Sequence, residues 1–276
     1  MELGSFDQTV LIFGGPYSNL SATQVIREEA SRLGISRERV ICSGDLVAYC
    51  AEPEETVNLI RDWDIPVVMG NCEESLAADA PDCGCGFETE SACSLLSVEW
   101  YRFARANVSS SNKKWMAQLP RRINFQLGGK SIAVVHGSLD SINEFVFQSS
   151  PADLKADQLM RSNVDIIIGG HSGIPFSNTL DKGYWLNSGV IGMPANDGTC
   201  DGWYMLLVPT DGGIEVSWHR LTYKVEQTIA AMQQAGVSAA YRECLGNGLW
   251  PSVDVLPAEE TAQMGQPIKL TTLMIA

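Results

Sequence analysis

Basic residues are scarce in this chain of 276 residues, which has 19 lysines and arginines against 33 aspartates and glutamates. Its formal net charge is −14. A surface that binds nucleic acid needs a basic footprint, so this balance argues against a nucleic-acid polymer as a partner. A small phosphorylated substrate or ligand remains open, because a bound metal ion can supply positive charge locally.

Long hydrophobic runs are also missing. No stretch approaches the roughly 20 apolar residues of a membrane span, and residues 1–6 lack the basic start and apolar centre of a signal peptide. We therefore expect a cytoplasmic protein with no membrane partner. The 45% hydrophobic content suffices for one large core, and no linker is evident. We expect a single domain over residues 1–250 and a C-terminal tail of unclear structure over residues 251–276.

Histidine is the rarest chemically useful side chain, with three copies. Two of the three follow a recurring pattern in which a short apolar run ends at a polar residue. The four examples are Val40–Ser43 before Gly44 and Asp45, Pro66–Met69 before Gly70 and Asn71, Ile132–Val135 before His136, and Ile166–Gly170 before His171. Such runs are typical of buried strands. Ligands of open α/β sheets bind at the carboxyl ends of the strands, and these four side chains together would form an oxygen and nitrogen shell for a divalent metal.

Each of the four polar residues also has an ordinary structural explanation. An Asp or Asn after glycine is often a turn former or helix cap, and a histidine in an apolar context is more often a core residue than a ligand. The ordered set of four is what favours a metal site. The third histidine, His219, lies in the alternating run 214–221 and receives no chemical role.

The rest of the chain alternates predicted strands and helices. Helices are expected at about Ala22–Leu33, Pro53–Asp62, Ser91–Ala106, Asp153–Met160 and Val225–Ala235. A first strand is expected at Val10–Phe13, and hairpins at Ile123–Leu127 with Ser131–Val135 and at Trp203–Val208 with Ile214–Tyr223. The aromatic stripe of residues 91–106 is typical of a core or of a subunit contact, so a homo-oligomer is one expectation.

Three longer stretches add to these strand ends: Gly44–Tyr49, Gly170–Pro175 and Asn187–Pro194. Together with the four strand ends, they resemble the calcineurin-like metallophosphoesterases, in particular their compact bacterial branch, from about Thr9 to Leu245. The resemblance implies an α/β fold, a sandwich of two mixed β-sheets flanked by helices. It also implies hydrolysis of phosphate esters at a two-metal centre, with the Asp of the Gly44-Asp45 motif bridging the ions.

The chain departs from the family at the first metal. Gly15 and Tyr17 stand where the family has its first Asp and His, and Gly173 replaces a later His. The first-metal site is thus degenerate, whereas the resemblance gives a complete second shell of Asp45, Asn71, His136 and His171. We expect one divalent ion per chain, Mn, Fe, Zn or Ni. Tyr17, Asn19 and Gly173 are candidate substrate-binding residues. Cys72 and Glu73 follow Asn71, where the family has a histidine that protonates the leaving group, so both are candidate catalytic residues.

The cysteines include a dense local group, Cys83, Cys85 and Cys93. Free buried thiols are the usual state in a cytoplasmic enzyme. The cluster could instead form a structural or regulatory metal site or a disulfide, or supply thiolates near the vacated first-metal position.

Two functions of different classes follow. The first is a metal-dependent hydrolase of small phosphate esters or nucleotides, in which Cys72 or Glu73 assists the leaving group. The second is a catalytically silent relative that binds a phosphorylated ligand or scaffolds a partner.

Overall fold

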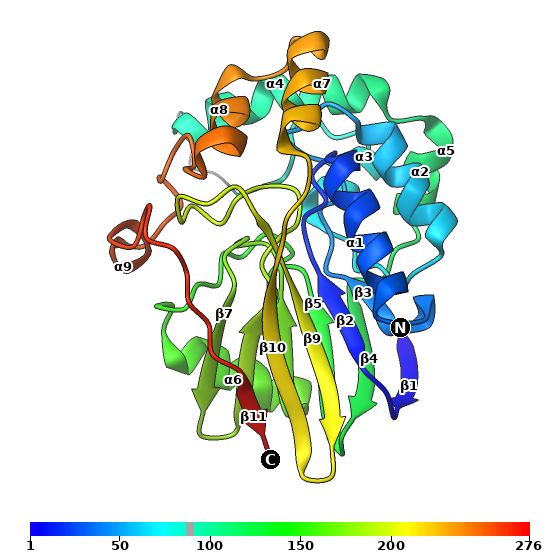
Figure 1. Cartoon of the computed structure of the whole chain (residues 1–276), viewed down its shortest axis with the longest axis vertical. Helices are drawn as coiled ribbons and strands as arrows, with labels where there is room; N and C mark the ends of the chain where they lie inside the picture. Colours follow the sequence, from blue (N-terminus) through cyan, green and yellow to red (C-terminus); the bar gives the residue numbers. More distant parts are fainter. Residues whose placement is uncertain (87–90) are drawn as a thin grey trace.

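Two mixed β-sheets pack face to face in the computed structural model, which describes residues 1–86 and 91–276 (Figure 1). The six-stranded sheet has the order β1 (Glu2–Phe6), β4 (Arg122–Leu127), β5 (Lys130–Val135), β6 (Ile166–Gly169), β8 (Gly183–Asn187) and β7 (Phe176–Leu180). The five-stranded sheet has the order β11 (Leu273–Ile275), β10 (Gly213–Leu221), β9 (Gly202–Thr210), β2 (Val10–Phe13) and β3 (Val40–Cys42). The predicted sandwich of two mixed sheets is confirmed.

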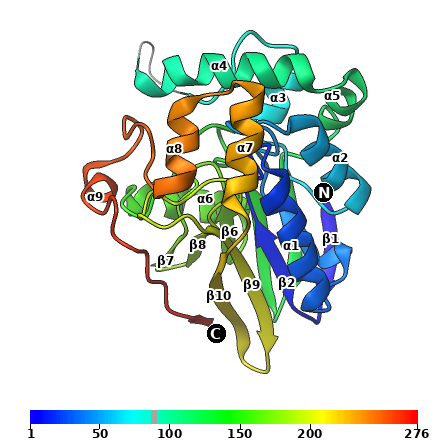
Figure 2. The ribbon, with the colours of Figure 1, turned by 45° about the horizontal axis from the view of Figure 1, so that its top comes forward.

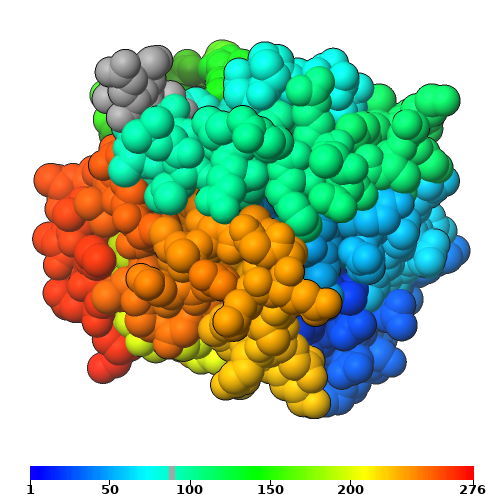
Figure 3. Space-filling model, turned by 90° about the horizontal axis from the view of Figure 1, so that it is seen from above, coloured from blue at the N-terminus to red at the C-terminus, as the bar shows by residue number. Residues whose placement is uncertain are grey.

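Helices cover the outer faces of the sandwich and one of its ends (Figure 1). They are α1 (Leu20–Arg32), α2 (Pro53–Trp63), α3 (Asn71–Ala77), α4 (Ala92–Asn107), α5 (Ser110–Met116), α6 (Ala152–Ser162), α7 (Val225–Ala235), α8 (Ala239–Asn247) and α9 (Ala258–Thr261), with a 3₁₀ turn at Arg37–Arg39. The long helix α4 crosses the covered end above α7 and α8 (Figure 2). Seen from above, the α4–α5 and α7–α8 segments lie side by side over that end (Figure 3).

The central strands are apolar throughout because both of their faces are buried. In β6, Ile166 and Ile168 point into the core between the two sheets, while Ile167 packs on the outer face with Leu159 of α6. In β2, Val10 and Ile12 enter the same intersheet core, and the alternate residues face the helices. Successive side chains of β2 and β6 therefore point alternately into the intersheet core and into an outer core, and neither strand contains a polar residue.

The helix-side core forms on the outer face of the five-stranded sheet. Leu11 and Phe13 of β2 belong to the same buried cluster as Ile26 of α1, Met232 of α7 and Leu245 of α8. Through this cluster, helices α1, α7 and α8 pack against the five-stranded sheet. Among the helices that the structure describes, none is long and apolar enough to cross a membrane.

The structure corrects one expectation about elements and adds detail to another. The run Pro66–Met69 is not a strand of its own, and only an isolated bridge joins Val67 to Cys42. Residues 251–276, whose structure the sequence left unclear, hold α9 and end in β11, which pairs antiparallel with β10 through Ile214 and Ile275. The tail runs down one edge of the sandwich back to the sheet (Figure 1).

Candidate metal centre

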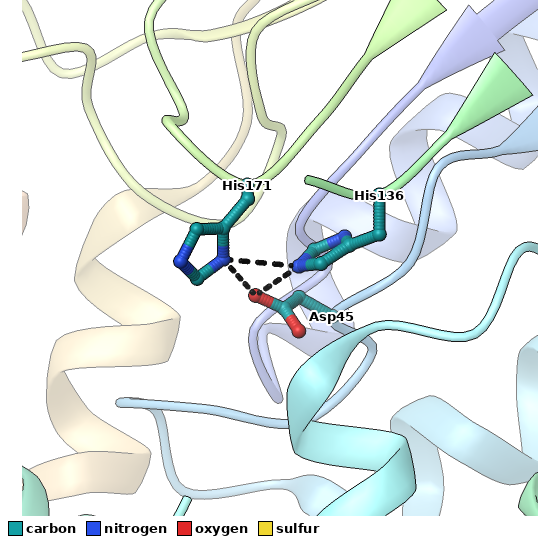
Figure 4. A group of neighbouring side chains, drawn as sticks. All are labelled: Asp45, His136 and His171. Carbon is teal, nitrogen blue, oxygen red and sulfur yellow. Dashed lines mark hydrogen bonds and ion pairs between the residues drawn. The ribbon is translucent and has the colours of Figure 1, made fainter. Parts of the chain in front are cut away.

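Three strand ends bring Asp45, His136 and His171 together (Figure 4). Asp45 follows β3 of one sheet, and the two histidines follow β5 and β6 of the other, so the cluster bridges the sandwich. His136 Nε2 lies 3.3 Å from Asp45 Oδ2 and 3.1 Å from His171 Nδ1. His171 Nδ1 lies 4.0 Å from the same Asp45 oxygen, and all three side chains are buried.

Asn71, the first residue of α3, adds a fourth donor to this cluster. Its Oδ1 lies 3.0 Å from His136 Nε2. Its Nδ2 donates to the Cys83 carbonyl at 2.9 Å, and that bond turns the amide oxygen toward the histidines. The structure therefore brings together all four residues that the sequence selected as ligands.

Backbone carbonyls orient both imidazoles. His136 Nδ1 lies 2.8 Å from the Ser43 carbonyl, and His171 Nε2 lies 3.3 Å from the Cys85 carbonyl. With the ring N–H groups donated to these carbonyls, His136 Nε2 and His171 Nδ1 keep their lone pairs for the cluster. One carboxylate, one amide oxygen and two such nitrogens fit a single divalent transition metal.

The electrostatics of the cluster separate the roles of the two histidines. Burial, reinforced by the nearby His136, lowers the pKa of His171 to about 3. Burial also acts against the charged form of His136, yet the Asp45 carboxylate raises the pKa of His136 above its usual value. Although burial opposes ionisation of Asp45, His136 holds the pKa of that carboxyl below its ordinary range. Asp45 is therefore a carboxylate and His171 a neutral imidazole at neutral pH.

Two glycines allow the loops of this cluster to approach one another. A Cβ on Gly70 would lie 2.4 Å from Asp45 Oδ1, and a Cβ on Gly44 would lie 2.9 Å from His136 Nδ1. Gly44 also has a φ of +100°, which favours glycine. The glycines that precede Asp45 and Asn71 are thus required by space around the cluster.

Glu73 has a structural position that differs from the acid role considered for it. Its carboxylate accepts hydrogen bonds from the backbone N–H groups of Asp45 at 2.8 Å, Leu46 at 2.8 Å and Gly70 at 2.9 Å. The side chain is fully buried, and burial together with the Asp45 charge raises the pKa of Glu73 to about 7. Glu73 thus ties two of the candidate ligand loops together, and these contacts support a positioning role instead of the acid role expected from the sequence.

Cys72 is likewise unsuited to proton donation. It is 1% exposed, and burial together with the Asp45 charge raises the pKa of its thiol well above the ordinary value. A thiol with a raised pKa is a poor acid for a leaving group at neutral pH. Its contacts are with the metal-site loop, where its backbone N–H donates to Asp45 Oδ1 at 3.4 Å.

The ring of Tyr17 lies between the other two residues that stand in place of the family's first-metal ligands, Gly15 and Gly173. A Cβ placed on Gly15 would lie 2.7 Å from two atoms of this ring, and a Cβ on Gly173 would lie 3.7 Å from its hydroxyl oxygen. The three exchanged residues are therefore neighbours, and one aromatic side chain occupies the space between them. Burial, with the Asp45 charge, raises the pKa of Tyr17 well above 10, which opposes a phenolate ligand there.

Asn19 does not face a substrate. Its Oδ1 accepts from the Ala22 N–H at 3.1 Å and from the Thr228 hydroxyl at 2.9 Å, and its Nδ2 donates to the Gly192 carbonyl at 3.0 Å. The side chain is fully buried as the N-cap of α1. Asn19 was expected to bind substrate, but both polar atoms of its side chain are already engaged within the fold.

The predicted thiol cluster separates into two parts. Cys83 and Cys85 form a disulfide beside the metal cluster, where Cys85 Sγ lies 3.3 Å from Asn71 Nδ2. Cys93 is a free thiol. The disulfide leaves these two sulfurs unavailable as thiolate ligands, and the segment acts instead through the Cys83 and Cys85 carbonyls that orient Asn71 and His171.

An apolar cavity opens beside His171, and most of it was missed by sequence reasoning. Its walls include Tyr17, Gly173, Cys93 and His171, together with a set of residues that carry no motif. The further wall residues are Tyr49, Phe145, Tyr241, Trp250 and Val255. Tyr49 closes the Gly44–Tyr49 motif, so that motif was a usable signal, but nothing in the pattern of residues 241–255 indicated a wall.

Comparison with known proteins agrees with this architecture. A family model described as the calcineurin-like phosphoesterase superfamily domain matches residues 18–211. An uncharacterised protein of Methanocaldococcus jannaschii is 27% identical over 259 residues, covering 87% of this chain and 97% of that protein.

Two solved structures share the fold over nearly the whole chain. One is a metallophosphoesterase from Sphaerobacter thermophilus, with a TM-score of 0.69 and 21% identity, covering 88% of this chain and 100% of that one. The other is a hypothetical protein from Pyrococcus horikoshii, with a TM-score of 0.74 and 13% identity, covering 91% and 100%.

Proposed function

Since the chain belongs to the calcineurin-like phosphoesterase superfamily, we propose that it hydrolyses small phosphate esters at one divalent ion held by Asp45, Asn71, His136 and His171. The observation that carries this proposal is the convergence of four donor atoms, three at strand ends from both sheets and the fourth at the start of α3, with each imidazole oriented by a backbone carbonyl. A chain that only scaffolds a partner has no need to preserve that geometry.

In this proposal, Asp45 and Glu73 have different roles in the site. Asp45 supplies the negative charge, and Glu73 fixes its loop through three backbone N–H groups. An ion bound at this shell would polarise a phosphoryl oxygen and lower the pKa of a water molecule. In the overall reaction the water oxygen bonds to phosphorus, the ester P–O bond breaks, and a water proton ends on the departing alcohol.

Tyr17 limits the expected rate. Its ring fills the position of the first metal, so one clamp on the phosphoryl group is lost. Two-metal enzymes gain several kcal/mol from that clamp, so we expect activity lower by roughly a thousandfold or more. Neither Cys72 nor Glu73 offers an accessible proton to the leaving group. Activated esters, whose alcohols leave without protonation, should therefore react best.

The test combines metal content with turnover. Protein purified without chelator should hold no more than one ion per chain by elemental analysis, and manganese should stimulate hydrolysis of bis(p-nitrophenyl) phosphate. Asn71→Ala and His136→Ala should each abolish the stimulation, whereas His219→Ala, on β10, should behave as the parent. Tight metal binding with no hydrolysis of any activated ester would identify a silent ligand-binding relative instead.

A further inference from the structure

The cavity beside His171 is small, rigid and aromatic. Its volume is about 60 Å³, which is room for about four water molecules at roughly 15 Å³ each, close to the size of one six-membered ring and too little for a nucleoside. Because His171 is both a wall residue and a metal-site donor, a group attached to a phosphate at the donors can enter the cavity directly.

The aromatic walls hold one another in place. The Tyr17 and Tyr49 rings meet edge to face at 4.8 Å between centroids, and the Tyr49 and Tyr241 rings lie 4.4 Å apart. Trp250 donates its indole N–H to the Pro194 carbonyl at 2.7 Å, and its backbone N–H to Asn196 Oδ1 at 2.8 Å. Such preorganised ring faces favour a flat aromatic group, since stacking geometry adds to simple burial.

The charges near the cavity determine which ligand charge is favoured. None of its described wall residues is a lysine or an arginine. One divalent ion beside the Asp45 carboxylate leaves a local charge of about +1, and ionisation of Glu73 would only lower it. A singly charged diester balances that charge, whereas a doubly charged monoester would leave a buried negative charge without a partner.

The nearest arginines do not change this balance. Arg121, Arg122 and Arg161 line a separate hollow behind His136. Arg121 pairs with Glu74, and Arg161 pairs with Asp140 and Asp157. The charges of Arg121 and Arg161 are thus already matched by surface carboxylates, and Arg122 donates to the Asn124 side chain and the Ser162 carbonyl.

We propose that the cavity receives a single aromatic ring carried as an ester group by a singly charged phosphodiester. The inference rests on the proposed function, since it needs a phosphate held at the four donors. It narrows the substrate from phosphate esters in general to aryl diesters, and it agrees with the lack of an accessible acid for the leaving group.

Three phosphonates, in which a P–C bond replaces the aryl ester bond and the only ester group is an unactivated methyl ester, separate ring from charge in an equilibrium titration by calorimetry with the manganese-loaded protein. Methyl phenylphosphonate has the ring and one charge, methyl methylphosphonate has one charge and no ring, and phenylphosphonate has the ring and two charges. We expect methyl phenylphosphonate to bind at least about tenfold more tightly than either of the others.

A matched pair of variants locates the ring. Val255 is a half-buried wall residue, so Val255→Phe should fill the cavity and reduce methyl phenylphosphonate binding to the level of methyl methylphosphonate. Val253→Phe makes the same change two residues away, outside the cavity walls, and should alter neither ligand. Should Val255→Phe fail to fold, Tyr241→Leu removes one aromatic face and should weaken only the ring-bearing ligands.

The outcomes distinguish the two proposals. Equal binding of the two monoanions, tighter binding of phenylphosphonate, or an unchanged ring preference in Val255→Phe would overturn the aryl cavity while leaving phosphate binding at the donors intact. If manganese binds but none of the three phosphonates does, the proposed function fails and the cavity assignment fails with it.

Discussion

His171 lies both in the candidate metal cluster, which its Nδ1 faces, and in the wall of the cavity, and the proposed function makes it a metal donor. His171→Ala should remove most of the affinity for manganese in a calorimetric titration. The fold should persist, because the residue lies just past the end of β6 and not within a sheet. Thermal denaturation of the metal-free proteins checks the second point. His219→Ala is the matched control, and equal manganese affinity in His171→Ala and the parent would refute this donor shell.

The proton held by His136 should make metal binding depend on pH. The Asp45 carboxylate raises the pKa of His136 in the metal-free protein against the effect of burial, so below that pKa an incoming ion must displace a proton. Affinity for manganese should therefore fall by up to about tenfold for each pH unit of acidification below the His136 pKa. His171, with a pKa of about 3, adds no second proton near neutral pH.

Titrations between about pH 6 and pH 8 in two buffers of different ionisation enthalpy measure this linkage. They should show release of between one and two protons per ion at the acid end, from His136 and from Glu73 with its pKa of about 7, falling toward none at the alkaline end. Release of two protons throughout, or affinity that rises on acidification, would contradict the assignment of charges.

The convergence of the four candidate ligand residues was predictable from the sequence, but the contacts that support them were not. Asp45, Asn71, His136 and His171 each follow a run of buried residues, and the ends of neighbouring strands meet at one edge of a sheet. The contacts of Glu73 and Asn19 could not be predicted, because a sequence does not show which backbone N–H groups a carboxylate or amide will meet after folding. Both side chains form hydrogen bonds with residues distant in the chain, and the sequence separation reaches 209 positions between Asn19 and Thr228.

At the scale of elements, Glu73 on α3 joins the loop after β3 to the start of its own helix. Glu73→Ala would leave the N–H groups of Asp45, Leu46 and Gly70 buried without an acceptor. We expect a loss of about 3–5 kcal/mol in the free energy of unfolding. Chemical denaturation measures that loss. Glu74→Ala, one position along on the half-exposed side of α3, should cost less than about 1 kcal/mol because its pairing with Arg121 is a surface contact.

Sequence patterns located best the strands that are buried on both faces, β2, β3, β5 and β6, which have uninterrupted apolar runs. Among the helices, α7 has the bounds expected for it, Val225–Ala235. Strands β1 and β7 have mostly exposed or half-buried residues, so no clear apolar period marks them. The run Pro66–Met69 was wrongly predicted as a strand. Pro66 has no N–H to donate, although its carbonyl accepts a hydrogen bond from the Cys42 N–H. The Met69 N–H donates to the Pro120 carbonyl, which does not belong to a strand.

At the scale of the whole molecule, the metal cluster connects the two sheets, since Asp45 belongs to one sheet's edge and both histidines to the other's. An ion that binds only the folded chain should therefore raise the thermal midpoint. At about 100 times its dissociation constant, manganese should stabilise the fold by about 2.7 kcal/mol, a rise of roughly 5–10 °C. Calorimetry with and without chelator measures it. An unchanged midpoint with the ion bound would show that the unfolded chain binds it equally well.

The ring of Tyr17 also prevents a second metal site from being built by single substitutions. Gly15→Asp alone would drive a Cβ to 2.7 Å from that ring and 2.5 Å from Val190 Cγ1, and Gly173→His alone would place a bulky side chain at a φ of +69°. Tyr17→His alone clears space but supplies one ligand of the three that are missing. Each single reversal loses packing before any second ion can be held, so a two-ion site is separated from this chain by several simultaneous exchanges. A single ion at the four donors would therefore stay single after any one of these substitutions, because the ring of Tyr17 leaves no space for the added ligand side chains.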